Sequence, residues 1–567
     1  MTGPRAVRVV TEVAAVDRPF DYLVPEHLAS LQLGDRVRVD FNHRSVRAWV
    51  VDEASLTPDL KPIGKWLGFG PPAEMLDLLE WASARWLAPL ARLLISASPK
   101  RLVTALPAAP AKRPLSTSIT DRLEAFEPGV TQLAPTTDPL GLVLHAYETT
   151  RSAPGSLLVV APTDAWARRL RGRLEQRGCE VAGTDQWERM RAQWPIVVGA
   201  RGAAMAPVAH VAGAVILDVD DEALRSESVP TWHAYDVLVE RCRREGRPLW
   251  ATSMFPSPRF MVGGWHREAG LAGGWPRLTV VDRRGGDPHD GLLARETLDA
   301  VHRALALNDP VAVVVVHQRL GRGRLLACAQ CHELYRCAVC SLAEQEADDL
   351  VACASGHEPR ERFCRSCGST RVKRLRQGVS TVQRDLEAQI GQPVSIVTAA
   401  DPLDGALARV VVGTEAVFQR VRRTSLVVID DFDQYLLAPR ESARRQAVGV
   451  VGRAGRLVGA RRDGRGSVVV QTRRGQDAVL RSLEEGSFEQ LLEDELETAR
   501  VLGLAPFGAA ATLRGEDAAA FALALDGERV RVSVGGQGVV VHARDIETLL
   551  DAVNVPSRPA SVRVAVE

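Results

Sequence analysis

The sequence has very little lysine: five lysines stand beside 66 arginines in a chain of 567 residues. A phosphate-binding loop of the form G-x4-G-K-[ST] needs a lysine directly after a glycine, because that lysine neutralises the bound phosphates. The only Gly-Lys dipeptide is Gly64-Lys65, and Trp66 follows it where the loop requires serine or threonine. The sequence therefore excludes a conventional P-loop ATPase.

Long apolar runs and a large charge excess are also missing. No stretch of eighteen uncharged apolar residues occurs, and the N-terminal segment MTGPRAVRVV lacks the basic and apolar parts of a signal peptide. We therefore expect a cytoplasmic protein that makes no contact with a membrane. The formal net charge is only +1, so any nucleic acid would have to bind at local basic patches.

The composition is that of a soluble globular protein, with 46% apolar and 25% charged residues over a length that requires several domains. Residues 1–105 contain short alternating apolar runs, such as the valines of GDRVRV, which predict a small β-rich domain. Apolar residues at helical spacing over 76–94 predict one helix that closes this domain, with its tryptophans in the core. Residues 106–135, rich in proline and alanine, predict a linker.

Continuous apolar runs alternate with helical patterns through the rest of the chain, as buried parallel strands do in βα units. The predicted strands lie at 156–162, 195–200, 213–220, 310–316, 393–399, 408–414, 425–431 and 466–472. We divide them between a first α/β lobe at 136–270 and a second lobe at 271–478. A C-terminal domain is expected at 479–567.

Seven of the nine cysteines lie between residues 328 and 367. They form three C-x2-C pairs and one single cysteine: Cys328/Cys331, Cys337/Cys340, Cys364/Cys367 and Cys353. A C-x2-C turn lets two thiolates meet one tetrahedral ion at about 2.3 Å, and four thiolates complete a closed structural zinc site. In a reducing cytosol this pattern indicates metal rather than disulfides, with free thiols as the alternative.

Two complete zinc sites need eight ligands, and the cluster supplies seven cysteines. The missing ligand is expected just after Cys353, where a fourth C-x2-C pair would place a cysteine at position 356. Gly356 stands there, and His357 follows. Histidine is the next-best zinc ligand, so His357 is the candidate. The alternative is an exposed histidine beside a weak site of three thiolates.

The order of features resembles the PriA family of primosomal replication restart proteins. The segments that carry the resemblance are RPFDYLVPEHL, GDRVRV, the cysteine cluster, GTEAVF, GRAGR and GLAPFG. The resemblance spans nearly the whole chain. It implies a multidomain α/β protein with a β-rich N-terminal DNA-binding domain, two RecA-like helicase lobes, a zinc-binding insertion at 326–376 and a small α+β C-terminal domain.

In this family two zinc ions are held by interleaved cysteine pairs. The resemblance therefore implies two zinc ions per chain, the first held by Cys328, Cys331, Cys364 and Cys367. The second would be held by Cys337, Cys340 and Cys353, with His357 as the candidate fourth ligand.

The chain departs from the family where the nucleotide should bind. The expected place of the phosphate-binding loop reads GLVLHAYETTRSAPG, without a Gly-Lys pair. The strand that should end in Asp-Glu-Glu-His reads ILDVDDEA, so Asp218 stands at the magnesium-binding position and Val219 at the catalytic one. A valine cannot orient water. We therefore expect degenerate helicase lobes with no catalytic residue.

The motif GRAGR raises a separate question, because helicases of superfamily 2 use its arginines to reach the γ-phosphate of a bound nucleotide. Without a nucleotide cradle, Arg453 and Arg456 need another role. The favoured interpretation is structural, with the glycines allowing close helix packing and the arginines bonding carboxylates. The alternative is contact with DNA phosphates.

In the PriA family the N-terminal domain captures the 3′ end of a nascent strand at a fork. The resemblance places Phe20, Asp21 and Tyr22 in that pocket, with Gly34 and Lys61 beside them. An aspartate can accept a hydrogen bond from a terminal 3′-hydroxyl, and a phenylalanine can stack on the terminal base. The alternative is that the two aromatic residues belong to the core.

Arg44 and Arg47 lie in FNHRSVRAW, on a predicted hairpin where they could neutralise backbone phosphates. The resemblance implies a monomeric, nucleoid-associated restart protein that binds forked and single-stranded DNA, the single-stranded-DNA-binding protein and the replicative helicase or its loader. Two alternatives remain open. One is an active ATP-dependent 3′-5′ DNA helicase with a non-standard nucleotide site, and the other is a zinc-containing interaction scaffold without fork specificity.

Overall fold

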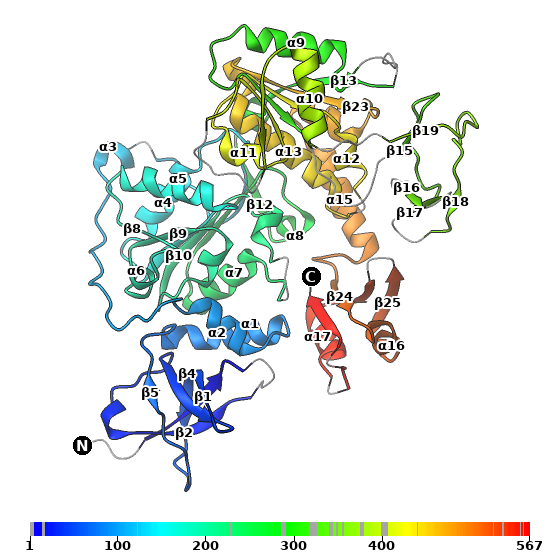
Figure 1. Cartoon of the computed structure of the whole chain (residues 1–567). Helices are drawn as coiled ribbons and strands as arrows, with labels where there is room; N and C mark the ends of the chain where they lie inside the picture. Colours follow the sequence, from blue (N-terminus) through cyan, green and yellow to red (C-terminus); the bar gives the residue numbers. More distant parts are fainter. Residues whose placement is uncertain are drawn as a thin grey trace.

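The computed structural model describes residues 5–13, 18–121, 123–226, 230–284, 291–317, 326–339, 344–347, 350–353, 357–374, 379–398, 406–438, 440–525, 527–535, 538–555, 557–559 and 561–566. They form an N-terminal barrel, two α/β lobes, a cysteine-rich insertion in the second lobe and a C-terminal α+β domain (Figure 1). Among the helices described, none combines the length and the apolar character needed to cross a membrane.

The N-terminal unit is an antiparallel sheet with the strand order β2-β1-β4-β3-β5. Its strands are β1 (Arg5–Thr11), β2 (Phe20–Val24), β3 (Arg36–Phe41), β4 (Arg44–Ala54) and β5 (Lys65–Trp66). Alternating valines fill its core: Val7, Val9 and Val37 are 0% exposed, and Val39 is 1% exposed. The period-two pattern correctly predicted this β-rich domain, because only one face of each strand is buried.

Residues 61–66 join the two edges of this sheet. The Leu23 amide donates to the Lys61 carbonyl at 3.0 Å, and the Gly64 amide donates to the Arg38 carbonyl at 2.9 Å. The first bond reaches β2 and the second reaches β3. The sheet thus closes into a small barrel, and the start of β2 comes close to the end of β3.

Two helices, α1 (Leu76–Arg85) and α2 (Leu90–Ala97), pack the barrel against lobe 1. The prediction of a single helix over 76–94 is wrong. The chain breaks where Leu87 adopts a positive φ of 49° and Pro89 precedes α2, since proline lacks the amide that would continue the helix. Trp86 is buried in the core, as predicted.

Lobe 1 is a parallel sheet with the strand order β12-β6-β11-β10-β7-β9-β8. Its strands are β6 (Gly129–Gln132), β7 (Ser156–Val160), β8 (Val181–Gly183), β9 (Ile196–Gly199), β10 (Val211–Ile216), β11 (Leu249–Ser253) and β12 (Trp265–Arg267). Its helices are α4 (Leu140–Thr150), α5 (Asp164–Glu175), α6 (Trp187–Arg191), α7 (Ala234–Glu245) and α8 (Pro258–Met261), preceded by the short α3 (Thr117–Thr120). β6 lies inside the segment expected to be a linker, where it pairs with β11 and β12.

Lobe 2 is also parallel, with the order β13-β23-β22-β14-β21-β20. Its strands are β13 (Arg277–Asp282), β14 (Val313–Val316), β20 (Val394–Val397), β21 (Val410–Gly413), β22 (Leu426–Ile429) and β23 (Ser467–Thr472). Its helices are α9 (Arg295–Leu305), α10 (Val379–Ile390), α11 (Val417–Arg420), α12 (Asp433–Leu436), α13 (Ala443–Val458), α14 (Ala478–Glu485) and α15 (Glu489–Leu502). Residues of α14 and α15 belong to the same core as α13, so this lobe continues past the expected boundary at 478.

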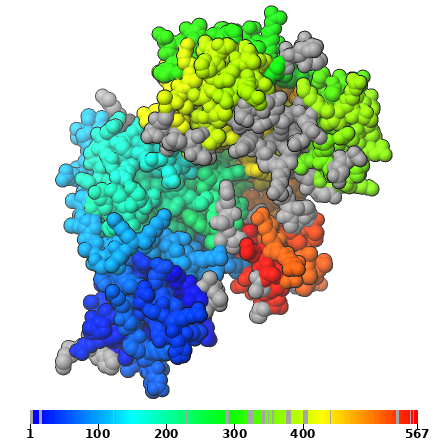
Figure 2. All heavy atoms as spheres, in the orientation of Figure 1, coloured from blue at the N-terminus to red at the C-terminus, as the bar shows by residue number. Residues whose placement is uncertain are grey.

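The cysteine module, residues 326–374, projects from the side of lobe 2 (Figure 2). It contains β15 (Leu326–Cys328), β16 (Glu344–Ala347), β17 (Leu350–Cys353), β18 (Arg360–Glu361) and β19 (Val372–Arg374). β15 and β19 pair with each other, so the module begins and ends at one place. Its small core holds Tyr335, Val351 and two cysteines.

The C-terminal domain is an antiparallel sheet with the order β25-β26-β24-β27. Its elements are β24 (Ala509–Arg514), α16 (Ala518–Leu523), β25 (Val530–Gly535), β26 (Gly538–Ala543), α17 (Ile546–Val553) and β27 (Arg563–Val566). The Val566 carbonyl accepts hydrogen bonds from Arg225 and Thr231 of lobe 1 at 3.4 and 3.1 Å. The domain therefore contacts lobe 1 as well as following lobe 2 in the chain.

Candidate functional site

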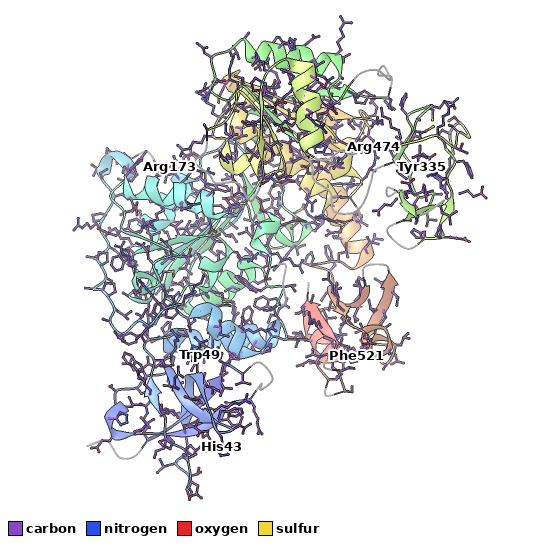
Figure 3. All side chains as sticks on the ribbon, in the orientation of Figure 1. His43, Trp49, Arg173, Tyr335, Arg474 and Phe521 are labelled. Carbon is purple, nitrogen blue, oxygen red and sulfur yellow. The ribbon has the colours of Figure 1, made fainter. Side chains whose placement is uncertain are left out.

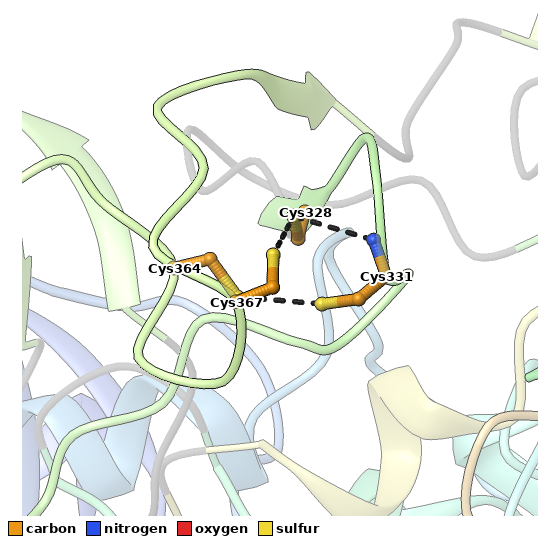
Figure 4. Close-up of side chains that lie close together, drawn as sticks. All are labelled: Cys328, Cys331, Cys364 and Cys367. Atoms are coloured by element: carbon orange, nitrogen blue, oxygen red, sulfur yellow. Dashed lines mark hydrogen bonds between the residues drawn. The ribbon is translucent and has the colours of Figure 1, made fainter.

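The first four-cysteine cluster lies where β15 ends and β19 begins. Cys328, Cys331, Cys364 and Cys367 have their sulfur atoms within 4.8 Å of one another. The sulfurs of Cys328 and Cys367 are 3.5 Å apart, and those of Cys331 and Cys364 are 3.4 Å apart (Figure 4). The structure thus brings together the four residues that the resemblance assigned to one ion.

These distances fit a tetrahedral zinc site. Four sulfurs at about 2.3 Å from one ion lie about 3.8 Å from each other. The amides of Gln330 and Cys331 point at the Cys328 sulfur, at 3.4 and 3.5 Å. Burial opposes ionisation of this thiol, but these amides and the neighbouring Cys367 outweigh it and lower the pKa of Cys328 to about 6. Cys328 therefore favours the thiolate, which is the zinc-binding form. At Cys331 the Glu333 amide favours the thiolate as well, but burial and the neighbouring sulfurs outweigh it and raise the pKa of Cys331 to about 12.

A second cluster contains Cys337, Cys353 and His357, whose ligand atoms also lie within 4.8 Å of one another. The Cys337 sulfur and the His357 Nδ1 are 3.5 Å apart. Cys340, the remaining predicted ligand, lies outside the described residues. The structure thus places His357 where a ligand is needed, rather than as an isolated surface histidine. The three described groups suit zinc, which accepts both sulfur and imidazole nitrogen.

In the structure, the position that a phosphate-binding loop would occupy is not the segment expected from the sequence. The segment GLVLHAYETT, within the stretch expected to replace the loop, is part of helix α4. The turn between a strand and the following helix, where such a loop would lie, is instead residues 133–139, between β6 and α4. That turn reads LAPTTDP and has neither glycine nor lysine. The phosphate cradle is therefore absent from the correct position as well.

Asp218 follows β10 and is held by an arginine of the other lobe. Its carboxylate forms an ion pair with Arg456 of α13 at 2.6 Å, and its side chain is 8% exposed. The Arg456 guanidinium also lies 4.5 Å over the Trp166 ring, and its Nε donates to the Pro135 carbonyl at 3.1 Å. Val219 is fully buried beside it. Arg456 thus contacts only lobe 1 groups in these interactions.

Arg453 makes the second connection between the lobes. Its guanidinium donates to Glu415 of lobe 2 at 2.6 Å and to Asp221 of lobe 1 at 3.4 Å. Burial opposes its charge, but Glu415 and Asp221 outweigh burial and raise the pKa of Arg453 further. We call this set of Arg453, Arg456, Asp218, Asp221 and Glu415 the arginine latch. Its two arginines are bonded to protein carboxylates.

The latch depends on a close approach of α13 to lobe 1. A Cβ on Gly452 would lie 2.6 Å from the sulfur of Met254 in lobe 1. One on Gly455 would lie 2.9 Å from the ring of Pro276, directly before β13 of lobe 2, so this glycine serves packing within lobe 2. A cavity of about 10 Å³ lies directly beside Asp218 and Arg456, and the turn after β6 and both latch arginines also line a larger cavity of about 560 Å³ between the lobes. The smaller space, beside Asp218, holds one water molecule at most.

Phe20, Lys61 and Arg44 gather at one rim of the barrel. The Phe20 ring meets the Phe41 ring edge-on at 4.9 Å. Arg44 pairs with Phe41 across the β3–β4 hairpin, and Lys61 lies 3.3 Å from Asp40 on β3. Arg44 is exposed and makes no ion pair with any residue in the described part of the chain. A partly apolar, basic rim results.

The hairpin at this rim points away from the lobes. Its turn residues Asn42 and His43 both have positive φ values, 49° and 61°, as a two-residue turn of type I′ requires. Figure 3 shows His43 at the outer end of the barrel and Trp49 at the end nearest α1 and α2. The Trp49 Nε1 donates to the Ser98 Oγ at 2.7 Å. The rim is thus open to a ligand from outside.

Asp21 faces the other side of β2. Phe20 and Tyr22 lie opposite the core residues Val9 and Val7, whereas Asp21 lies opposite Arg8. The Arg8 Nε donates to the Asp21 Oδ1 at 3.0 Å, and both side chains remain partly exposed. Side chains alternate along a strand. The structure therefore does not bring Phe20 and Asp21 to the same face, although the expected pocket uses both.

The remaining predicted DNA contacts have structural partners. Tyr22 is 4% exposed and its hydroxyl donates to the Asp40 carbonyl, so its ring belongs to the core. Gly34 has a φ of 88°, and a Cβ there would lie 1.8 Å from the Pro71 carbonyl oxygen, which explains why glycine is needed. Arg47 pairs with Glu12 at 2.6 Å.

Sequence reasoning missed several residues at these sites. Arg8 and Trp166 carry no motif of their own, and Glu415 lies in GTEAVF without having been singled out; like Asp221, each was found only through a contact with another segment of the chain. A weak signal existed for Asp221, because it belongs to the acidic run of ILDVDDEA. The register of β1 against β2, which places Arg8 beside Asp21, could not be read from either strand alone.

Comparisons with known proteins find similarity to the PriA family. Residues 8–99 match the PriA family described as "3'DNA-binding domain (3'BD)". The chain is 26% identical over 477 residues to a probable replication restart protein PriA of Mycobacterium leprae, covering 71% of this chain and 71% of that protein. It is 24% identical over 340 residues to the replication restart protein PriA of Thermotoga maritima, covering 55% and 45%.

Among solved structures, S. cerevisiae Dbp5 bound to RNA and ADP BeF3 aligns with a TM-score of 0.37 and 13% identity. The alignment covers 69% of this chain and 94% of that one.

Proposed function

This chain is a relative of the replication restart protein PriA, and on that premise we propose that it recognises stalled or abandoned replication forks and nucleates primosome assembly and loading of the replicative helicase. The proposal includes the absence of ATPase and helicase activity. Its substrate is forked DNA with a nascent 3′ end, and its partners are the single-stranded-DNA-binding protein and the replicative helicase or its loader.

The observation that carries the DNA-binding proposal is the rim of the barrel within residues 8–99. Phe20 offers an aromatic ring and Arg44 an exposed positive charge at the same rim, where Lys61 pairs with Asp40. Aromatic stacking and basic side chains are the usual means of holding single-stranded ends. The matched family is described as binding 3′ DNA. These features support capture of a strand end at the rim.

Asp21 supplies the end selectivity in this proposal. β2 is an edge strand, and within the described chain its outer side is bridged only at Leu23. A DNA strand end that approaches this edge could therefore contact the Phe20 ring on one face of β2 and the Asp21 carboxylate on the other. Only the Oδ1 of Asp21 is bonded to Arg8, which leaves the second oxygen to accept a hydrogen bond from a terminal hydroxyl.

The loss of catalysis is supported by two independent features. The turn after β6 has no glycine or lysine to cradle phosphates. The arginine latch occupies Asp218, which would bind magnesium, and leaves about 10 Å³ beside it. The lobes in this proposal act as a scaffold whose closed arrangement does not require a nucleotide.

The cysteine module is proposed to hold two zinc ions. One is bound by Cys328, Cys331, Cys364 and Cys367, and the other by Cys337, Cys353 and His357 together with Cys340. Zinc supplies folding energy to short loops that have little core of their own. The ordered module then presents a surface for protein partners on the side of lobe 2.

A single titration tests the proposal. Labelled fork DNA with a nascent 3′ end is titrated with the purified protein, with and without ATP and magnesium, and phosphate release is followed in the same samples. We expect fork binding tighter than binding to linear duplex, and no DNA-dependent phosphate release. Hydrolysis that survives rigorous purification would overturn the inactive assignment. Equal affinity for fork and linear duplex would instead favour a scaffold without fork specificity.

A further inference from the structure

The four sulfurs of the first cysteine cluster differ in their access to solvent. Cys331 and Cys367 are exposed, whereas Cys328 and Cys364 are buried. A closed structural zinc site uses all four sulfurs in the same way, so zinc binding alone does not call for this difference. Oxidants attack the sulfurs that are both exposed and ionised. The cluster therefore has two accessible sulfurs and two protected ones.

Each exposed sulfur lies beside a buried sulfur of the other C-x2-C turn. The Cys367 sulfur is 3.5 Å from that of Cys328, and the Cys331 sulfur is 3.4 Å from that of Cys364. Figure 4 shows the Cys331 sulfur directed toward the other turn, while its backbone nitrogen faces the Cys328 sulfur. A disulfide needs its sulfurs about 2.05 Å apart. The sulfurs of each of these pairs have to approach by only about 1.4 Å.

These two pairs span the neck of the module, which is the paired ends of β15 and β19. Cys328 is the last residue of β15 and lies opposite Val372 of β19. The turn that holds Cys364 and Cys367 directly precedes β19. Disulfides between the turns would therefore tie the two ends of the module together, and such a closed loop restricts the unfolded chain. Disulfides within each turn would leave the two ends unjoined.

The second cluster offers an oxidant less access. Among its ligands in the described part of the chain, Cys337 and Cys353 are both buried. Its third described ligand, His357, is partly buried and cannot form a disulfide. The two clusters should therefore respond to an oxidant at different rates, with the first cluster ahead.

We propose that the first cluster is a reversible oxidation site for hydroperoxides, at which the exposed Cys331 and Cys367 react first and form disulfides across the neck with the buried Cys364 and Cys328. This inference rests on the zinc site of the proposed function, because bound zinc keeps the cysteines as thiolates. It adds a response to oxidants on the side of lobe 2. The barrel rim is not affected, since residues 8–99 contain no cysteine.

Each disulfide forms in two balanced steps. The exposed thiolate attacks one oxygen of the peroxide, so the O–O bond breaks, the sulfur becomes a sulfenic acid and the other oxygen leaves as hydroxide. The buried thiolate then attacks that sulfur, so the S–S bond forms, the S–O bond breaks and a second hydroxide leaves. One disulfide thus consumes one hydrogen peroxide, and each sulfur loses one electron. Two disulfides remove all four thiolates, and no ligand is left to hold the ion.

The first experiment treats the full-length, zinc-loaded chain with hydrogen peroxide and follows zinc release with a metal-sensitive dye. We expect one zinc ion to leave before the other, and dithiothreitol with added zinc to restore the original content. Fork affinity of the oxidised chain should stay unchanged. Cys179 and Cys242 are internal controls, because both are buried in lobe 1 and should remain reduced thiols.

A tryptic peptide map identifies which sulfurs have joined. Trypsin cuts after arginine, and the three peptides that carry the cysteines of the first cluster are 325–336, 363–365 and 366–371. Disulfides across the neck join all three peptides, whereas disulfides within the turns leave the first peptide separate from the other two. We expect the product of three joined peptides. Fragmentation of its longest peptide should show Cys328 linked to Cys367 and Cys331 linked to Cys364.

Cys353→Ser is the matched control, because it removes a ligand of the second cluster and none of the first. Its oxidised form should give the same three joined peptides. In the wild-type chain, Cys337 and Cys353 should still be free thiols when one zinc ion has been released.

Three results would overturn the proposal. They are disulfides confined within the two turns, sulfurs of the first cluster converted to acids that dithiothreitol does not restore, and oxidation of Cys337 or Cys353 before the first cluster. A chain that carries no zinc when purified would instead refute the zinc sites of the proposed function. The peptide map of that chain after oxidation would then decide between pairs across the neck and pairs within the turns.

Discussion

Asp21 is the residue on which selectivity for a strand end depends. If its free oxygen accepts a hydrogen bond from a 3′-hydroxyl, forks ending in a 3′-phosphate should bind about tenfold to a hundredfold more weakly, because the carboxylate would face an anion. Asp21→Ala should abolish that difference. Competition binding with the two fork ends measures it.

Asp52 offers the control for this experiment. It lies 3.9 Å from the same Arg8 but on β4, outside the Phe-Asp-Tyr segment. Asp52→Ala should therefore keep the preference for the hydroxyl end. A wild-type protein that binds both ends equally well, or a loss of preference in both variants, would contradict the role assigned to Asp21.

Substitution of Arg44, another single residue, tests the electrostatic contribution to DNA binding. Its side chain is exposed at the hairpin, where it has no ionic partner among the described residues. Arg44→Ala should reduce the slope of log affinity against log salt by about one unit, since one phosphate contact is lost. End preference should not change. The measurement is a fork titration at several salt concentrations, with Asp21→Ala as the variant that should leave the slope unaltered.

At the scale of elements, helix α13 is the part that joins the lobes. Arg456→Ala should destabilise lobe packing by about 2–3 kcal/mol, because it leaves the nearly buried Asp218 carboxylate without its partner. A double-mutant cycle with Asp218→Asn should give a coupling energy of similar size. Thermal and urea unfolding measure both.

Arg440 provides the matched control for the latch. It also bridges the lobes, pairing with Glu222 at 3.3 Å, but both side chains are more than half exposed. Exposed ion pairs contribute about 0–1 kcal/mol. Arg440→Ala should therefore have little effect. A cost for Arg440→Ala as large as that for Arg456→Ala would mean that the lobes are held by general charge attraction and not by the latch.

Elements with a local signal were predicted well from the sequence. The apolar runs of β7, β10, β14 and β23 are buried on both faces of parallel sheets, so they appear as continuous runs. The C-x2-C spacing likewise depends only on a short turn. These features need no information from distant parts of the chain.

Features that depend on distant partners were not predictable in the same way. β6, with the sequence GVTQ, becomes a strand because β11 and β12 lie on either side of it. Arg453 bonds to Asp221, which lies more than two hundred residues away in the sequence. The separation of Phe20 and Asp21 onto two faces of β2 is different, because strand alternation alone could have shown it.

At the scale of the whole molecule, metal content should follow the two ligand clusters. Purified protein should carry close to two zinc ions, and Cys328→Ser should lose about one of them, because three ligands hold the ion too weakly to order the module. Metal analysis by mass spectrometry, with limited proteolysis of the module, checks both. Cys179→Ser is the control, since Cys179 is buried in lobe 1 away from the clusters.

Two outcomes would change this assignment. A content near zero in protein purified without chelator would refute both sites. A content near one, unaffected by His357→Ala, would show that the cluster of Cys337, Cys353 and His357 binds no metal.

The pairing of β15 with β19 makes the cysteine module separable from the lobe that carries it. Leu326 and Arg374 are direct partners in that pair, so the chain between them leaves and rejoins lobe 2 at one neck, beside which Ala327 and Leu334 pack on Leu437 of lobe 2. Such an insertion can be excised as a cassette. Replacing 327–373 with Asn-Gly, which makes a two-residue hairpin turn, should leave lobe 2 folded and fork binding intact, while contacts with protein partners are lost. The shortened chain would thus divide recognition of DNA from recruitment of proteins.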